Sequence, residues 1–184
     1  MATRNSIGLI ELGSIAAGFQ LTDAMLKAAD VELVLARTIC SGKYMVLVRG
    51  DTAAVEAAVQ TGKQVGDFSV IDTFQIPNVH ASIFPAIAGV TKAGQLEALG
   101  IIESFSVASL IEGADVMAKS ANVRLVEVRL AMALGGKAFA SCTGTVAAVT
   151  AAVENGARKI AEKGLLVNRV IIPNPRPELR NEMI

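Results

Sequence analysis

The chain has little of what most enzyme active sites need. Its 184 residues include one histidine, one tyrosine, two cysteines and no tryptophan, and only 18% of them are charged. A single imidazole without an evident partner is a poor catalytic base. The sequence also has no phosphate-binding glycine loop, nucleophile elbow or metal-ligand spacing. We therefore expect no enzymatic activity, and we interpret His80 as a local cap or packing residue at a predicted helix start.

An excess of charge of one sign is also lacking. The chain carries 17 basic and 17 acidic residues, so its formal net charge is zero, and no basic residues cluster along it. Surfaces that bind DNA or RNA are strongly basic. The balance of charge therefore argues against a nucleic-acid partner.

Long apolar runs and secretion signals are missing as well. No uninterrupted apolar stretch approaches the roughly 18 residues that a membrane helix needs, and residues 1–5 lack the apolar segment of a secretory signal. The two cysteines, Cys40 and Cys142, form no CxxC motif, and such isolated thiols are typical of a reducing compartment. The sequence thus predicts a cytoplasmic protein with no membrane partner and no disulfide.

What the chain does have is a surplus of small apolar residues. Hydrophobic residues make up 52% of it and aromatic residues only 4%, with a mean hydropathy of +0.50. A small monomer rarely hides so much apolar surface. We therefore expect extensive contacts between subunits.

The chain also repeats itself. Gly8-Leu9-Ile10-Glu11 returns 92 positions later as Gly100-Ile101-Ile102-Glu103, and the pattern Asp-x-Met-x-Lys-x-Ala-x-Val of residues 23–31 returns at 115–123. The offset grows to 94 at residues 42–43 and to 96 at residues 76–78, which two short insertions in the second copy explain. The sequence therefore predicts a tandem duplication of one domain of about 90 residues, with copies at 1–93 and 94–184.

Each copy has the pattern of a small α/β domain of the α+β type. In copy one, apolar and β-branched runs predict strands at residues 7–12, 31–39, 43–49 and 68–76. Helical spacing predicts helices after a Ser14 cap, after Gly50-Asp51, which ends the strand and caps the next helix, and at 80–88, where Pro85 starts or kinks the last one. The predicted helix-one stripe consists of Ile15, Phe19, Met25, Leu26 and Ala29, and that of helix two of Val55, Ala58 and Val59. The order βαββαβ is that of a ferredoxin-like fold, with both main helices on one face of an antiparallel sheet.

The repeated Gly-Leu/Ile-Ile-Glu strand, the Asp-x-Met-x-Lys segment and the Ala-Ala-Val-x-Ala-Ala-Val helix together resemble bacterial microcompartment shell proteins with two shell domains in one chain. The resemblance covers residues 7–177. It implies a homotrimer whose six similar domains form a pseudohexameric tile, and tiles that join neighbouring shell proteins in a flat lattice around enzymes. A head-to-tail ring of three doubled chains also closes on geometric grounds.

The resemblance further implies how tiles touch. Lys27 and Lys119 match the lysine at the helix edge that packs between neighbouring tiles in this family. Many members also carry an arginine between two prolines near the C-terminus. Here Asn174 holds that place and Arg176 follows two positions later. We expect all four residues at the contact between tiles, with the arginine shifted.

In this family the loop between the second and third strands lines the central pore. In copy one the resemblance assigns Ile39, Cys40, Ser41, Gly42 and Lys43 to the pore, and in copy two, whose loop is two residues longer, Ala133, Leu134, Gly135 and Gly136. The first loop resembles that of the iron–sulfur-bearing tandem shell proteins of propanediol compartments, in which Pro-Gly-Lys follows the cysteine. Here Ser41 replaces the proline.

Threefold symmetry would bring three Cys40 thiolates to one axis, enough to hold a [4Fe–4S] cluster, one per trimer, by three of its irons. We expect Lys43 to favour the thiolate, and Cys142 to be a buried apolar side chain. The cluster would transfer electrons across the shell, serving enclosed redox enzymes, or be delivered to them. Two alternatives stay open: a metal-free tile with an open or gated metabolite pore lined by Cys40, and a regulatory module that binds a small ligand.

Overall fold

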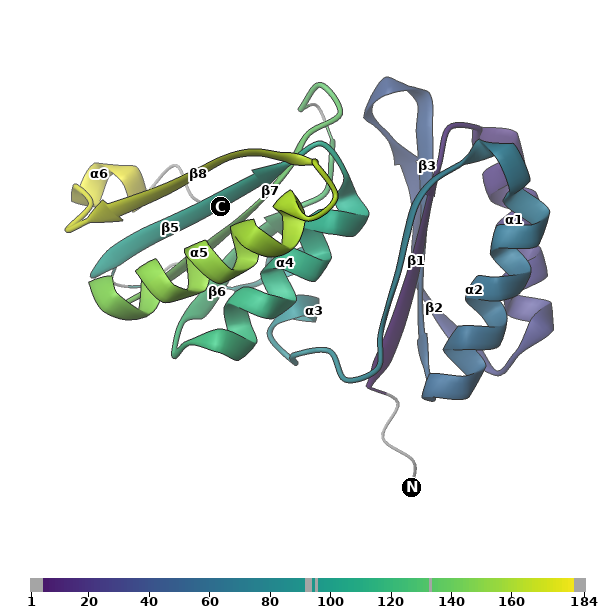
Figure 1. Cartoon of the computed structure of the whole chain (residues 1–184), viewed down its shortest axis with the longest axis horizontal. Helices are drawn as coiled ribbons and strands as arrows, with labels where there is room; N and C mark the ends of the chain where they lie inside the picture. The colour runs from purple at the N-terminus through teal and green to yellow at the C-terminus, as the bar shows by residue number, and fades with distance from the viewer. Residues whose placement is uncertain (1–4, 92–93, 95, 133, 181–184) are drawn as a thin grey trace. The chain divides into compact units, whose positions relative to one another are not determined.

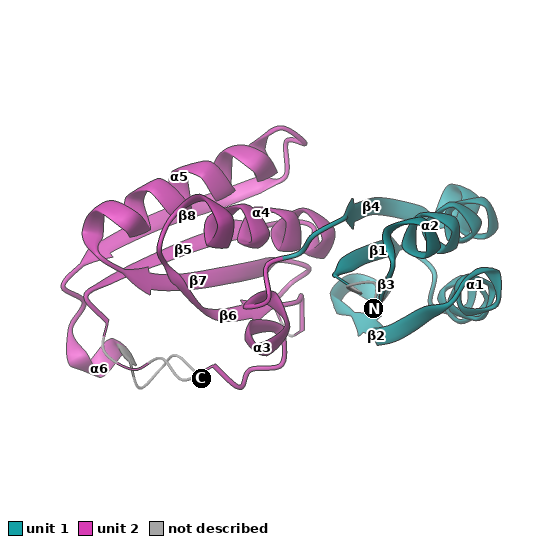
Figure 2. Ribbon diagram, turned by 90° about the horizontal axis from the view of Figure 1, so that it is seen from below, with its two compact units in different colours: residues 1–79 teal, residues 80–184 magenta. Residues whose placement is uncertain are grey.

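The chain folds into two compact units, residues Met1–Val79 and His80–Ile184 (Figure 2). The structure is a computed structural model, and it describes residues 5–91, 94, 96–132 and 134–180. Each unit is one four-stranded antiparallel sheet with two long helices on one face (Figure 1). The predicted ferredoxin-like duplication is therefore confirmed.

Unit 1 has the strand order β2-β3-β1-β4. A short 3-10 turn, Cys40–Gly42, joins its second and third strands, and another, Asp67–Ser69, precedes the fourth. Its elements are β1 (Ser6–Leu12), α1 (Ile15–Ala28), β2 (Val31–Ile39), β3 (Lys43–Gly50), α2 (Thr52–Gly66) and β4 (Val70–Ile76).

Unit 2 has the matching order β6-β7-β5-β8 and carries two additional short helices. Its elements are α3 (Ile83–Ile87), β5 (Ala98–Ser104), α4 (Val107–Ser120), β6 (Arg124–Arg129), β7 (Ala138–Gly144), α5 (Val146–Ala161), β8 (Leu166–Pro173) and α6 (Pro177–Arg180). The sequence repeat ends at residue 93, whereas the units divide after Val79, because α3 packs on α4 and β6 of the second unit.

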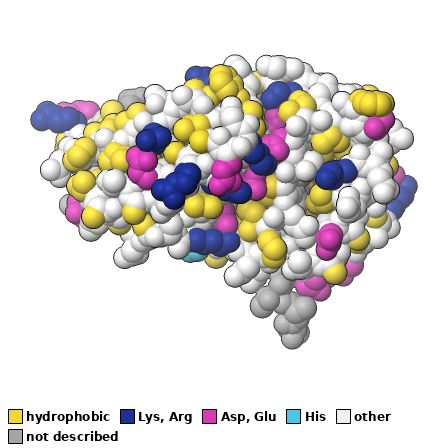
Figure 3. Space-filling model, viewed as in Figure 1, with side chains coloured by type: hydrophobic (Ala, Val, Ile, Leu, Met, Phe, Trp, Pro, Cys, Tyr) yellow, Lys and Arg dark blue, Asp and Glu magenta, His cyan; other side chains and the backbone are white. Residues whose placement is uncertain are grey.

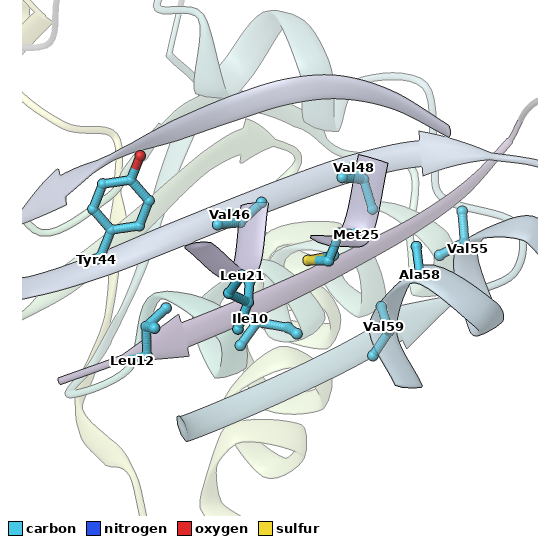
Figure 4. Close-up of a cluster of buried hydrophobic side chains, with 10 residues drawn as sticks. All are labelled: Ile10, Leu12, Leu21, Met25, Tyr44, Val46, Val48, Val55, Ala58 and Val59. Atoms are coloured by element: carbon cyan, nitrogen blue, oxygen red, sulfur yellow. The ribbon is translucent and has the colours of Figure 1, made fainter. Parts of the chain in front are cut away.

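The core of unit 1 lies between its sheet and its two long helices (Figure 4). Gly8 on β1 lets α2 approach the sheet, since a Cβ there would lie 2.5 Å from Val59. Gly100 does the same on β5, where a Cβ would lie 2.5 Å from Val153. The cluster drawn in the figure consists of Ile10, Leu12, Leu21, Met25, Tyr44, Val46, Val48, Val55, Ala58 and Val59.

The helix starts follow the sequence in most places. Ser14, Ser106 and Thr145 each accept a hydrogen bond from the backbone N–H three residues later, at 3.3, 3.1 and 3.2 Å. Asp51 stands at the start of α2 but its side chain makes no capping hydrogen bond, so the expected cap there is wrong.

The predicted apolar stripe of α1 is also wrong in part. Ile15, Phe19 and Leu26 are exposed, whereas Gly18 and Leu21 join Met25 on the buried face. The predicted stripe of α2 is confirmed, because its three residues are buried. The last short helix of copy one contains Pro85, as expected, but begins at Ile83 rather than at residue 80.

No helix in the described ranges combines the length and the apolar character needed to cross a membrane.

Candidate functional site

The turn between β2 and β3 is short and has an unusual backbone. β2 and β3 pair up to Ile39 and Lys43, so three residues close the hairpin. Ser41 has φ 66° and ψ 28°, and Gly42 has φ 71°. Two consecutive residues are thus left-handed, a conformation that glycine adopts freely and serine rarely does.

Cys40 opens this turn and is half-buried at the surface. The second cysteine lies in a different setting. Cys142 is on β7, fully buried, and burial raises the pKa of its thiol to about 12, partly offset by a hydrogen bond with the Gly100 backbone. The expectation that Cys142 is a buried apolar side chain is therefore confirmed, and neither thiol forms a disulfide.

Lys43 anchors the first turn to the sheet. Its Nζ lies 2.7 Å from Oε1 of Glu11 on β1, and the carboxylate side chain is only 1% exposed. The positive charge is therefore compensated by a buried acid. This weakens the expected electrostatic support of the Cys40 thiolate by Lys43, since the carboxylate cancels much of its field.

The second turn repeats this anchor without a thiol. Lys137 Nζ lies 2.6 Å from Oε1 of Glu103 on β5, and both side chains are more exposed than in the first pair. Gly135 and Gly136 have φ of 61° and 86°, and the Lys137 N–H donates to the Leu134 carbonyl at 3.2 Å. Ala133, a predicted pore residue, lies outside the described residues. Glu11 and Glu103 recur at the same place in the two repeats, and so do Lys43 and Lys137. The recurring lysines were the signal in the sequence that could have predicted both ion pairs.

The two helix-edge lysines each bond an aspartate four residues earlier. Lys27 and Asp23 are 2.6 Å apart, with side chains 74% and 63% exposed. Lys119 and Asp115 are 2.5 Å apart, but this aspartate is only 6% exposed. The predicted role of both lysines between tiles stays a prediction.

Sequence reasoning missed a further bond of Asp115. Its Oδ1 accepts a hydrogen bond from the His80 backbone N–H at 2.7 Å, while the His80 ring contacts Ser82 at 2.8 Å. The imidazole is exposed and acts locally at the segment leading into α3, as expected. No local sequence pattern indicates a hydrogen bond between two residues that are 35 positions apart.

The end of β8 carries the remaining predicted contact residues. Asn174 has φ 45°, and its backbone N–H donates to the Glu97 carbonyl at 3.0 Å. Arg176 is 85% exposed and lies 3.4 Å from Glu178. Both residues therefore belong to the segment between β8 and α6.

The sheet face of unit 2 opposite its helices holds a groove of about 280 Å³, lined by Ile101, Glu103, Phe139, Asn168, Arg169 and Val170.

The described residues contain no group of three histidine, cysteine or acidic side chains placed to hold a metal ion. A metal centre at Cys40 would therefore need thiols from several chains. On the face shown in Figure 3, basic and acidic side chains lie interspersed, in keeping with the balanced net charge.

Comparison with known proteins matches this geometry to one family. The sequence model of the BMC domain matches residues 6–79 and 98–175. The chain is 41% identical over 179 residues to the bacterial microcompartment shell protein PduT of Citrobacter freundii, covering 97% of each chain. It is 30% identical to the carboxysome assembly protein CcmO of Synechococcus elongatus, covering 97% of this chain and 68% of the relative. Among solved structures, a microcompartment protein from Desulfitobacterium hafniense has a TM-score of 0.88 and 49% identity, covering 96% of this chain and 98% of that one.

Proposed function

This chain belongs to the BMC domain family, as a bacterial microcompartment shell protein with two domains in tandem, and from that premise we propose that three copies form a pseudohexameric tile with a [4Fe–4S] cluster at its axis. The observation that carries the proposal is the single half-buried thiol, Cys40, in the turn that lines the pore in this family. The alternation of two unlike turns around the ring would present this thiol three times rather than six.

Two observations support the trimer. Two similar domains in each of three chains give six wedges, and a head-to-tail contact between them closes a ring. The groove on the open sheet face of unit 2 exposes Phe139, Ile101 and Val170 in part. Covering that groove with a neighbouring chain would absorb the apolar surplus seen in the composition.

The residues around Cys40 fit a shared ligand. The thiol is partly accessible at a surface turn, so sulfurs from other chains can meet it, whereas the buried Cys142 cannot be reached. The Glu11–Lys43 ion pair fixes the base of the turn against β1, which holds Cys40 in a defined position. A [4Fe–4S] cluster bound by three such thiolates supplies one-electron transfer, with one iron left to a non-protein ligand.

At the shell, this tile would join neighbouring shell proteins through its edges. Lys27 and Lys119 stand at corresponding helix edges of the two domains, and Asn174 and Arg176 lie on the segment after β8. A cluster at the axis would let electrons pass between the outside and enclosed redox enzymes, or would be handed to those enzymes. No catalytic role of the chain itself is needed for either.

Anaerobic purification followed by iron analysis and electron paramagnetic resonance tests the metal centre. We expect roughly four irons per trimer in the native chain, as one [4Fe–4S] cluster requires. Cys40→Ser should lose the iron and the signal, while the matched variant Cys142→Ser, which alters the buried thiol, should keep both.

A native trimer that stays colourless and free of iron after anaerobic reconstitution would contradict the cluster. It would favour the metal-free pore. Sedimentation of the native chain separately tests the trimer, because a monomer at micromolar concentration would contradict the tile itself.

A further inference from the structure

The segment that follows β4 does not pack on its own sheet. Its helix α3 packs on α4 and β6 of unit 2 (Figure 2). The His80 N–H donates to Asp115 Oδ1 at 2.7 Å, and Ile83 and Ala86 are buried. The arm that ends the first repeat thus covers one side of the second.

The matching surface of unit 1 is open. Three positions on α1 and β2 are compared with the positions 92 residues later on α4 and β6. Asp23 is 63% exposed and Asp115 6%. The exposed fraction is 38% at Leu26 against 8% at Ala118, and 41% at Leu33 against 1% at Leu125. The elements that α3 covers in unit 2 therefore have uncovered counterparts in unit 1.

A second arm exists in the chain. The sequence offset of 96 places residues 173–180, which include α6, where residues 77–84 stand in the first repeat. Arg176 then corresponds to His80, and Leu179 to Ile83. Yet Leu179 is 40% exposed, and among the described residues α6 has no packing on another element comparable to that of α3. Figures 1 and 2 show α6 beyond the end of β8.

The backbone of this second arm also contains a hydrogen-bond donor. Pro175 and Pro177 have no N–H, so the N–H of Arg176 is the only backbone donor of that tripeptide. Within the described part of the chain this N–H has no hydrogen-bond partner. Asp23 presents an exposed carboxylate at the position of the acceptor Asp115, and each of the two aspartates is paired with the lysine four residues later.

We propose that residues 174–180 of one chain dock on α1 and β2 of a second copy, with the Arg176 N–H bonded to Asp23 and Leu179 packed near Leu26 and Leu33. This contact rests on the proposed trimer and names how its ring closes. Each chain supplies one arm within itself, through α3, and one to its neighbour, through α6. Three exchanged arms then cover three open surfaces.

Disulfide trapping tests the contact directly. The double variant Asp23→Cys/Arg176→Cys is made in a Cys40→Ser background, where the remaining Cys142 is buried. After mild oxidation we expect covalent dimers and trimers on a non-reducing gel, and none from either single variant. The matched variant Asp115→Cys/His80→Cys should close a bridge within one chain, because the His80 backbone N–H already contacts the Asp115 side chain, at 2.7 Å from its Oδ1.

A bridge within the chain for the first pair, or no bridge while the matched pair closes, would overturn the proposal. A second measurement separates it from the trimer. Leu179→Asp should raise the dissociation constant of the trimer at least tenfold by sedimentation, whereas Val90→Asp, at a residue that is 68% exposed outside the arm, should leave it unchanged.

If the native chain is a trimer and both variants dissociate alike, the docked arm is wrong and the trimer stands. If the native chain is a monomer, both are wrong.

Discussion

The two domains fill the same space between their first long helix and the sheet with opposite combinations of large and small side chains. In unit 1 a glycine on α1, Gly18, lies under the ring of Tyr44, so close that a Cβ would come within 2.3 Å of it. Tyr44 also lies 5.1 Å from the Phe19 ring. At the corresponding positions of unit 2 stand Leu110 and Ala138, both fully buried. The large side chain comes from the strand in one domain and from the helix in the other.

The duplication therefore preserves volume and topology more strictly than residue identity. Interiors are close-packed, so a glycine opposite a tyrosine and a leucine opposite an alanine can fill similar space. The surfaces have meanwhile diverged: one turn carries a thiol and the other does not, and one helix edge is covered while the other is open.

The largest effect is expected from giving unit 1 the large helix residue and the small strand residue that unit 2 has at these positions. Tyr44→Ala should cost about 3–5 kcal/mol of unfolding free energy, because it leaves a cavity over Gly18. Gly18→Leu alone should cost about 1–3 kcal/mol through overpacking. The double variant should be more stable than Tyr44→Ala, as measured by urea unfolding at one protein concentration.

The reciprocal pair Leu110→Gly/Ala138→Tyr serves as the control in unit 2. The losses of unfolding free energy from Gly18→Leu and Tyr44→Ala could instead add in the double variant. The leucine would then not fill the space that the tyrosine leaves, and the comparison would fail.

A smaller effect is expected at the two turn anchors. Lys43→Met removes the lysine paired with a carboxylate that is 1% exposed, whereas Lys137→Met acts on a pair whose side chains are 40% and 27% exposed. We expect losses of about 3 kcal/mol for the first and about 1 kcal/mol for the second, because only the first leaves a deeply buried charge.

Thermal and urea unfolding of both variants measure this difference. Glu11→Gln/Lys43→Met should recover part of the loss, since it removes the negative charge of the buried carboxylate. Equal losses at the two turns would show that burial does not distinguish the anchors.

The smallest effect concerns the buried thiol. Burial raises the pKa of Cys142 from 9.0 to about 12, so the thiol is protonated in both folded and unfolded chains only well below pH 9. Between pH 9 and 12 the unfolded chain loses this proton first, and stability falls as the pH rises. Relative to Cys142→Ala, the native chain should lose about 1 kcal/mol between pH 9 and pH 10 in urea unfolding. Parallel pH profiles of the two proteins would contradict the raised pKa.

Much of the fold could be predicted from the sequence, because the repeat carried it. The predicted strand at 31–39 agrees with β2, and the buried face of α2 was given by Val55, Ala58 and Val59. The face of α1 could not be predicted the same way. Its buried side depends on Gly18, which carries no hydrophobic signal and is buried only because Tyr44 faces it. Phe19, an apolar residue, is left 64% exposed.

The candidate site was predictable in composition but not in geometry. The different lengths of the two turns follow from the sequence, because the offset between the repeats grows from 92 to 94 there. The sequence also shows that only the first turn carries a cysteine, Cys40. The left-handed Ser41 could not, because serine fits several turn types. The hydrogen bond from His80 to Asp115 could not be predicted either, because it joins the end of one repeat to a helix of the other.

The handedness of the Ser41 backbone limits which sequences this turn can accept. Proline fixes φ near −65°, so Ser41→Pro could not keep the present path of the chain and would force the turn to rebuild. Glycine, asparagine and aspartate adopt the observed φ and ψ angles more readily than other residues and are therefore the substitutions that this turn accepts. Libraries that vary this turn and keep its backbone should therefore draw position 41 from those three residues.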